Sequence, residues 1–186
     1  LSDWLSQEEH SQIFLLNGYA GTGKTTIIAA LVGALKELGI KTILLAPTGR
    51  AAKVLARYSH SDALTIHKRI YRERTITDYE SKFSLDYNKE RGALFIVDEA
   101  SMLSSSSSAD DAAFGSGNLL DDLVQYVRSG KQCRLMLVGD DAQLPPVGAD
   151  YSPALDPASL LPYGDVVYAT MDEVVRQQHD SGILFN

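Results

Sequence analysis

The sequence predicts an α/β fold in which helices cover both faces of a parallel sheet. Short apolar runs alternate with helical patterns along the 186 residues, and the runs are apolar nearly throughout. Such runs are typical of strands that are buried on both faces, and strand–helix–strand repetition is typical of a parallel sheet. We therefore expect a single domain, long enough to bury a core without disulfides.

Five runs are predicted to be strands, and three segments are predicted to be helices. The strands are expected at Ile13–Leu16, Thr42–Ala46, Leu94–Val97, Arg134–Val138 and Val166–Ala169. The helices are expected at Lys24–Leu38, Arg50–Tyr58 and Leu119–Val127. Gly39 is a stop signal after the first helix, whose apolar stripe is predicted to contain Ile27, Ile28, Leu31, Val32, Leu35 and Leu38.

Three segments interrupt this alternation. Residues 71–92 are charged, with local alternation in Lys82–Tyr87, and are expected to form a small hairpin insertion. Residues 104–117 are rich in serine, glycine and aspartate and are predicted to be a mobile loop. Residues 148–165 contain three prolines and are expected to run over the surface.

Composition limits the classes of protein that fit. The net charge of −7 disfavours a broad basic face for nucleic acid, although a narrow track of amides, hydroxyls and a few cations remains compatible with it. One cysteine, Cys133, excludes an internal disulfide framework and is expected to pack as a small apolar residue. The longest apolar run, Ile27–Leu35, is shorter than the roughly 20 residues that span a bilayer. We expect a cytoplasmic protein with no membrane partner.

The two ends of the sequence look cut. The chain begins with Leu1 rather than methionine, and it stops at Asn186 just after a helix pattern begins at Asp180. We therefore interpret residues 1–186 as a single domain of a longer protein.

The loop after the first strand predicts phosphate binding. Gly18 to Thr25 reads GYAGTGKT and matches the pattern G-x-x-x-x-G-K-[ST]. Glycines let successive backbone N–H groups converge on phosphate oxygens, and the following helix N-terminus adds partial positive charge. Lys24 is predicted to reach the β- and γ-phosphates of ATP, and the Thr25 hydroxyl is predicted to coordinate Mg²⁺. The expected nucleotide-binding residues are Gly18, Ala20, Gly21, Thr22, Gly23, Lys24, Thr25 and Thr26.

Two acids follow the third predicted strand. Leu94–Val97 runs directly into Asp98 and Glu99. Ligands bind at the carboxyl ends of strands in open α/β sheets, so we expect Asp98 to hold Mg²⁺. Glu99 is expected to activate the attacking water as a general base, which favours hydrolysis over transfer. GTP is disfavoured, because the string nearest to a guanine-reading Asn-Lys-x-Asp element, Asn88 to Arg91, lacks the aspartate.

Two further motifs narrow the prediction. Ala46 to Lys53 reads APTGRAAK, and Val138 to Val147 reads VGDDAQLPPV. With the phosphate loop and the acidic strand end, they resemble the first motor domain of superfamily-one DNA helicases of the RecD type, which include the exodeoxyribonuclease V alpha subunit. The resemblance extends from about Ile13 to Leu184 and implies a P-loop NTPase with a RecA-like parallel sheet, the N-terminal motor domain of a DNA repair helicase.

The resemblance implies roles for single residues. Gln143 would contact the γ-phosphate and the attacking water, since an amide both donates and accepts, and Arg176 would neutralise charge at the γ-phosphate. Lys24, Glu99, Gln143 and Arg176 are thus the expected catalytic residues, and Thr25 and Asp98 the expected metal ligands. The expected contacts to single-stranded DNA are Thr48, Arg50, Lys53 and His67. Further helicase–nuclease subunits are expected partners.

Other interpretations remain open at this point. Arg176 could be a solvated helix charge, and His67 could be a packed histidine. The adenine-reading glutamine segment of the family is not evident, and residues 71–92 are short for the strand-splitting pin that relatives carry there. A P-loop small-molecule kinase and a nucleotide-gated binding module are the alternative functions. A kinase would need an arginine-bearing lid, which the sequence does not show.

Overall fold

The computed structural model describes residues 4–5, 12–77, 80–103, 114–140, 142–143, 145–146 and 150–171. Its main sheet has six strands: β1 (Ile13–Gly18), β2 (Thr42–Ala46), β3 (Ala63–Thr65), β6 (Leu94–Val97), β7 (Arg134–Gly139) and β8 (Val166–Met171). The spatial order is β3-β2-β6-β7-β1-β8, and every neighbouring pair is parallel. This is the α/β architecture that the sequence predicts.

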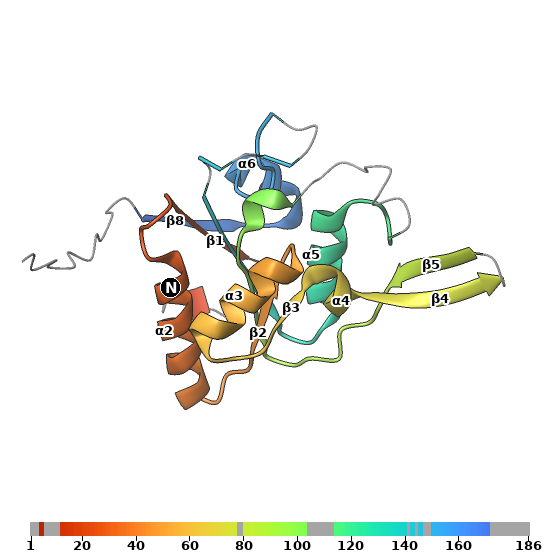
Figure 1. Ribbon diagram of the computed structural model, residues 1–186, viewed down its shortest axis with the longest axis horizontal. Coiled ribbons are helices and arrows are strands. Elements are labelled where there is room, and N and C mark those ends of the chain that lie inside the picture. The colour runs from red at the N-terminus through yellow and green to blue at the C-terminus, as the bar shows by residue number, and fades with distance from the viewer. Residues whose placement is uncertain are drawn as a thin grey trace, which may run out of the picture.

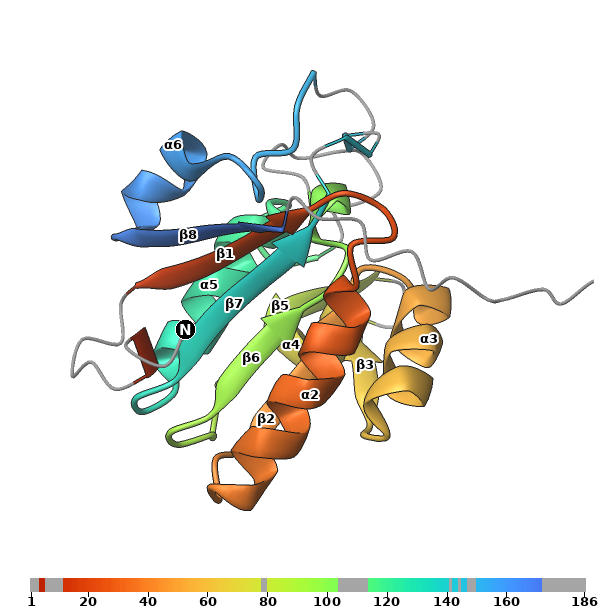
Figure 2. The same cartoon turned by 90° about the vertical axis from the view of Figure 1, so that its left-hand side faces the viewer.

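The helices lie on both faces of this sheet. They are α2 (Lys24–Glu37), α3 (Gly49–Ser59), α4 (Ile66–Ile70), α5 (Leu119–Ser129) and α6 (Pro157–Leu160), with 3₁₀ turns η1 (Ala100–Met102) and η3 (Leu161–Tyr163). Figure 2 shows α2 in front of the sheet and α5 behind it. In the part of the chain that the structure describes, no helix is long and apolar enough to cross a membrane.

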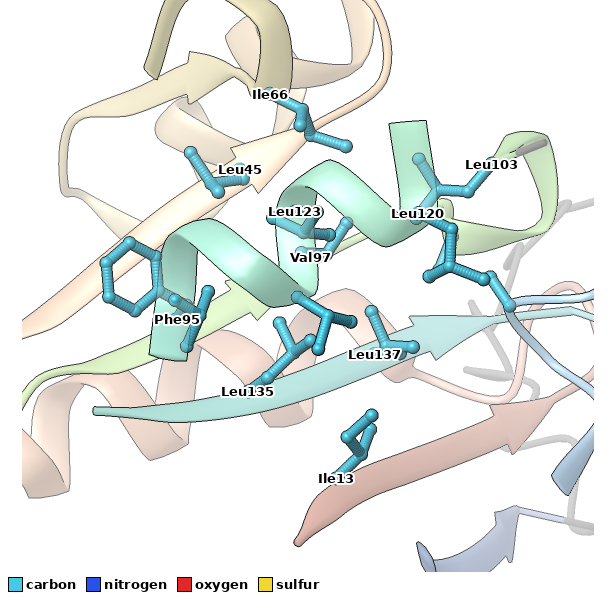
Figure 3. Packing of buried hydrophobic residues seen from close by; sticks show 14 of the residues in the cluster. Ile13, Leu45, Ile66, Phe95, Val97, Leu103, Leu120, Leu123, Leu135 and Leu137 are labelled. Atoms are coloured by element: carbon cyan, nitrogen blue, oxygen red, sulfur yellow. The ribbon is translucent and has the colours of Figure 1, made fainter. Parts of the chain in front are cut away.

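Alternate residues of each strand supply two separate cores. In β1, Ile13 and Leu15 belong to the core under α4, α5 and α6, whereas Phe14 and Leu16 belong to the core under α2 and α3. This follows from strand geometry, since successive side chains point to opposite faces. Figure 3 shows strand residues such as Phe95, Val97, Leu135 and Leu137 around Leu120 and Leu123 of α5.

A second, two-stranded sheet lies within residues 71–92. Strands β4 (Tyr71–Thr77) and β5 (Glu80–Leu85) pair antiparallel, with Tyr71 opposite Leu85. The hairpin projects away from the main sheet (Figure 1). Its base is joined to the segment before α5 through an isolated bridge between Phe83 and Phe114.

The elements agree with the sequence predictions in most places. All five predicted strands and three predicted helices are present, with boundaries that shift by one or two residues. Two details were wrong. Ile27 and Leu38 are 39% and 73% exposed instead of buried in the α2 stripe. Residues 150–165 do not merely run over the surface, because Ala154, Leu155 and Leu160 are buried in the core. Most of the predicted loop, residues 104–113, lies outside the described residues.

Candidate nucleotide site

The sheet topology creates a crevice between β1 and β7. The chain leaves β1 toward α2 on one face, whereas it leaves the neighbouring β7 toward α6 on the other face. Adjacent strands whose connections diverge in this way leave a crevice at their carboxyl ends, where open α/β sheets bind ligands. The loop from Gly18 lies at the end of β1, and the Asp140 motif follows the end of β7.

Two glycines give the phosphate loop its curvature. Gly21 and Gly23 have φ angles of 82° and 87°, a region that residues with a Cβ atom rarely adopt. Gly23 is also the N-cap of α2, so the N-terminus of this helix opens directly into the loop. Converging N–H groups and the positive end of the helix dipole make the loop an anion site.

Gly18 is required for a different reason, which is close packing. A Cβ atom at Gly18 would lie 2.8 Å from Thr22 Oγ1 and 2.9 Å from Met171 Cβ. Thr22 is itself buried, and its hydroxyl and backbone N–H both donate to the Tyr19 carbonyl, at 2.8 and 3.2 Å. Thr22 therefore shapes the loop from inside, whereas Ala20, Gly21 and Thr26 lie on its exposed side.

Lys24 reaches back over the loop. Its ammonium donates to the backbone carbonyls of Gly18 and, at 3.0 Å, of Tyr19. It also lies 3.9 Å from the carboxylate of Asp140, whose side chain is 3% exposed. The lysine is thus held where phosphates bound by the loop would meet it.

Asp140 is a site residue that the sequence reasoning did not single out. Besides its ion pair with Lys24, its Oδ1 accepts from the backbone N–H of Ala142 at 3.0 Å, and its carbonyl accepts from that of Gln143 at 3.2 Å. Asp140 therefore shapes the turn that carries Gln143 and ties it to the phosphate loop. The sequence offers only its place two residues after the predicted strand Arg134–Val138, which does not by itself mark an aspartate as a site residue.

Asp98 and Glu99 follow β6 at the same edge of the sheet. Asp98 is half-buried, and burial raises the pKa of its carboxyl above the ordinary value, as does the Glu99 charge. The Glu99 backbone N–H, which donates to Asp98 Oδ1 at 3.0 Å, and the Lys24 charge oppose this rise. Glu99 is exposed and has a left-handed backbone, with φ 54° and ψ 39°. A non-glycine residue in this conformation is strained, and such strain concentrates at functional sites.

A hydrogen bond connects Gln143 to the turn that follows Asp98 and Glu99. The hydroxyl of Ser101, which is fully buried, donates to Gln143 Oε1 at 3.2 Å. Ser101 lies in η1, two residues after Glu99. The structure thus connects two of the four predicted catalytic residues, Lys24 and Gln143, through Asp140, and bonds Gln143 to Ser101, which lies two residues after Glu99. The fourth, Arg176, lies outside the described residues.

The donor set at this edge fits a magnesium ion bound with a nucleotide. Thr25 offers a hydroxyl from the first turn of α2, and Asp98 offers a carboxylate. Within the described ranges, no group of three or more His, Cys, Asp or Glu side chains could hold a metal. Mg²⁺ commonly takes one or two protein ligands and completes its shell with phosphate oxygens and water.

The predicted DNA contacts lie beyond the ends of β2 and β3. Thr48 accepts from Ala51 N–H at 3.2 Å and caps α3, on which Arg50 and Lys53 are exposed. His67 lies in α4 and packs in an aromatic cluster, with ring centroids 5.6 Å from Tyr71 and 5.0 Å from Phe114. The Thr48 hydroxyl thus caps α3, and His67 is partly buried in the aromatic cluster, whereas Arg50 and Lys53 make no ion pair among the described residues.

The glycine loop, its helix and the acidic strand end make this protein a P-loop NTPase with a RecA-like sheet. The chain belongs to the family described as "AAA domain", whose model matches residues 6–184. Family membership implies nucleotide binding.

Curated relatives include two helicases. The chain is 33% identical over 145 residues to the ATP-dependent RecD2 DNA helicase of Deinococcus radiodurans, a match that covers 78% of the chain and 18% of the relative. It is 39% identical over 94 residues to the ATP-dependent DNA helicase dda of Enterobacteria phage T4, which covers 47% of the chain and 20% of the relative. An uncharacterized protein of Methanocaldococcus jannaschii is 32% identical over 89% of the chain and 15% of the relative.

A solved structure shares the fold. The crystal structure of Pif1 helicase from Candida albicans matches 96% of this chain and 40% of its own, with a TM-score of 0.51 and 19% identity. The chain spans 15–20% of the length of the curated relatives that it matches.

Proposed function

We propose that this chain is the ATP-binding motor domain of a RecD-type DNA helicase, which couples hydrolysis of Mg-ATP to movement on single-stranded DNA. The observation that carries the proposal is the connection of Lys24 to the turn of Gln143 through Asp140, at the edge that also holds Asp98 and Glu99. The similarity to two ATP-dependent DNA helicases supports the choice of reaction and of partner.

Each residue has a role in this hydrolysis. Lys24 neutralises the β- and γ-phosphates, while Glu99 accepts the proton of the attacking water. Gln143 donates from its amide to a γ-phosphate oxygen, and Arg176 adds positive charge there. Thr25 and Asp98 would hold Mg²⁺, which when bound neutralises charge on the β- and γ-phosphates.

Movement requires that the nucleotide state changes the grip on DNA. Gln143 is suited to report that state, because it is bonded to Ser101 beside Glu99 and lies on the turn that Asp140 ties to Lys24. The proposed DNA contacts are Thr48, Arg50 and Lys53 at the start of α3 and His67 in α4, beyond the carboxyl ends of β2 and β3 at the same edge of the sheet. Closure against a second RecA-like unit, followed by release after hydrolysis, would then advance the protein along the strand. Assembly with helicase–nuclease subunits and a role in DNA repair belong to the same proposal.

Two variants test the nucleotide chemistry. Lys24→Ala is expected to abolish binding of a fluorescent ATP analogue, whereas Lys36→Ala, an exposed lysine in the last turn of the same helix, should bind normally. Glu99→Gln is expected to retain ATP binding and to lose ATP hydrolysis. Its control is Glu37→Gln, which changes an exposed glutamate at the end of α2. Normal turnover by Glu99→Gln would remove Glu99 from its proposed role.

DNA stimulation tests the motor. Single-stranded DNA should raise the ATPase rate of the full-length protein, and the rise should be absent in Glu99→Gln; the isolated domain is expected to hydrolyse ATP only slowly, because the facing RecA-like unit is missing. An ATPase rate that is indifferent to DNA would refute the helicase assignment and favour the nucleotide-gated module or the kinase.

A further inference from the structure

A cavity of about 510 Å³ lies beside the nucleotide site on the α6 face. It is bounded by the end of β1, the turn of Gln143, residues 150–157 and β8, and Figure 1 shows α6 next to β8. Its described lining consists of Asn17, Gln143, Pro145, Asp150, Tyr151, Ser152, Leu155, Asp156, Pro157 and Tyr168. The volume falls within the range of small-molecule sites, which is about 300–1,000 Å³.

Two tyrosines give this cavity fixed aromatic surfaces. The hydroxyl of Tyr168 accepts from Asn17 Nδ2 at 3.4 Å, and the hydroxyl of Tyr151 lies 3.3 Å from Ser159 Oγ. Although both hydroxyls are bonded to neighbouring side chains, Tyr168 and Tyr151 are 48% and 58% exposed. Rigid, half-exposed aromatic rings are platforms on which a flat ring can stack.

The charge of the cavity selects against phosphate. Its described lining contains the carboxylates of Asp150 and Asp156 and no lysine, arginine or histidine. The Ser159 hydroxyl holds the pKa of Asp156 below its ordinary value, so this carboxylate is ionised at neutral pH. The cavity therefore attracts N–H donors and repels anions.

One polar atom of the lining has no partner. Ser152 Oγ is buried and makes no hydrogen bond in the described structure. A buried hydroxyl without a partner costs free energy, which a ligand with a donor or acceptor at that point would recover. Together with the Asn17 and Gln143 amides, the cavity offers both donors and acceptors beside its aromatic rings.

We propose that this cavity binds a nucleobase, stacked on Tyr151 or Tyr168 and bonded through its amino and ring-nitrogen groups to the polar lining. The base could come from a single-stranded nucleic acid or from a free nucleoside; the first source rests on the proposed function, and the second does not. Because Gln143 borders the cavity and bonds Ser101, an occupying base lies in contact with the residue proposed to sense the γ-phosphate.

The test compares intact with abasic strands. Binding of a short single-stranded oligonucleotide containing one 2-aminopurine is measured for the unchanged protein, Tyr168→Ala and Tyr151→Ala. Loss of one stacking partner should lower the affinity for the intact strand about 5- to 150-fold. The affinity for the same strand with an abasic position should be nearly unaffected. Tyr58→Ala, which removes a 61% exposed tyrosine from α3, is the matched control. Tyr168→Phe keeps the ring and should retain base binding if Tyr168→Ala fails to fold.

A second arm identifies the source of the base. Adenosine and 2-aminopurine riboside are titrated by fluorescence, alone and in competition with the oligonucleotide. If the unchanged protein binds a nucleoside and the tyrosine variants do not, the proposal that the cavity binds a base is supported, even if DNA does not bind. Failure of DNA to bind would then count only against the motor proposal. If the tyrosine variants bind nucleosides and intact strands as the unchanged protein does, or if abasic strands lose as much affinity as intact ones, the inference is wrong.

Discussion

At the scale of single residues, Ser101 determines how Gln143 is presented. The Ser101 hydroxyl donates to Gln143 Oε1, so the carbonyl side of the amide faces η1 and its NH₂ group is turned away. An NH₂ group donates only, and therefore suits a phosphate oxygen better than a proton of water. The sequence-based expectation gives Gln143 both contacts, and this orientation leaves the NH₂ group for the phosphate and the second lone pair of Oε1 for the water.

Removing this hydroxyl should affect turnover more than binding. For Ser101→Ala we expect the kcat of ATP hydrolysis to fall roughly 2- to 13-fold, the equivalent of a hydrogen bond worth about 0.5–1.5 kcal/mol, with KM for ATP little changed. Steady-state kinetics and nucleotide titration measure the two effects. Ser59→Ala is the control, because Ser59 is also buried but donates to Leu55 O within α3. A rise in KM at unchanged kcat would contradict a positioning role.

The residues of the candidate site differ in whether a short sequence motif identifies them. Lys24, Asp98, Glu99 and Gln143 could be predicted because short motifs carry them. Asp140 and Ser101 could not, since their contacts to Lys24 and Gln143 exist only once β6, β7 and β1 lie side by side. Neither residue type is diagnostic without those neighbours.

At the scale of elements, the base of the β4–β5 hairpin is fixed to α5. Asp122 is 2% exposed, and its Oδ2 accepts from the Tyr71 hydroxyl at 2.7 Å and from Ser116 N–H at 3.0 Å. Phe114 stacks on Phe83 with ring centroids 4.6 Å apart. The base of the hairpin is therefore held in place by hydrogen bonds to Asp122 and by stacking of two phenylalanine rings.

Tyr71→Phe tests this attachment. The variant keeps the ring contacts and removes one donor from a buried carboxylate, which should lower the free energy of unfolding by about 1–3 kcal/mol. Urea denaturation monitored by circular dichroism measures the change. Tyr87→Phe, at a 65% exposed tyrosine, should leave the stability as it is. Equal stability of both variants would mean that the Asp122 contact is not holding the hairpin.

A second linkage between elements depends on pH. Glu90 bonds Lys41 before β2 and Arg69 in α4, each at 2.7 Å. Burial alone would raise the pKa of Glu90, but the hydrogen bonds and charges of these two cations outweigh it and hold the pKa below its ordinary value. A lowered folded-state pKa means that the pairs stabilise the fold above the unfolded pKa, and that this stability is lost as pH falls through the folded value.

Glu90→Gln should therefore destabilise the protein at pH 7 by roughly 1 kcal/mol, since the pairs are partly exposed. The difference from the unchanged protein should shrink as the pH falls below the ordinary glutamate pKa of about 4.3 and through the lowered pKa of Glu90 in the folded state. Thermal unfolding at pH 7 and near pH 3.5 measures it. Glu37→Gln serves as the control, and a difference that stays constant across this range would exclude the linkage.

Element prediction succeeded where periodicity was strong. The buried strands and the longer helices were recognised because their apolar patterns extend over several residues. β3 has three residues and α4 has five, too few for a period to be read. In α6, Pro157 lies in the first turn and Asp156 is the N-cap. A proline that the sequence analysis assigns to a surface segment therefore begins a helix.

At the scale of the whole molecule, the net charge conceals an uneven distribution. Residues 41–72 contain seven of the 17 lysines and arginines and only one of the 24 acids, Asp62. This stretch includes α3 with its exposed Arg50 and Lys53. A chain of charge −7 thus has a basic stretch that can meet a phosphate backbone, which the overall composition hides.

The double variant Arg50→Ala/Lys53→Ala tests this surface. Affinity for single-stranded DNA should fall, and the slope of log K against log salt should decrease by about 0.7 for each phosphate that the variant no longer neutralises. Fluorescence anisotropy over a series of salt concentrations measures the slope. ATP binding without DNA should not change, and Lys36→Ala should behave as the unchanged protein. An unaltered slope would mean that Arg50 and Lys53 do not contact the DNA phosphates.

The tight fit between Gly18 and Met171 has a mechanical consequence. The two residues are in register across β1 and β8, with no room for even a methyl group between them. The backbone at Gly18, where the phosphate loop begins, and the backbone at Met171 should therefore shift together. Because Met171 is the last residue of β8, a displacement that nucleotide produces at the loop would be transmitted to the end of this strand.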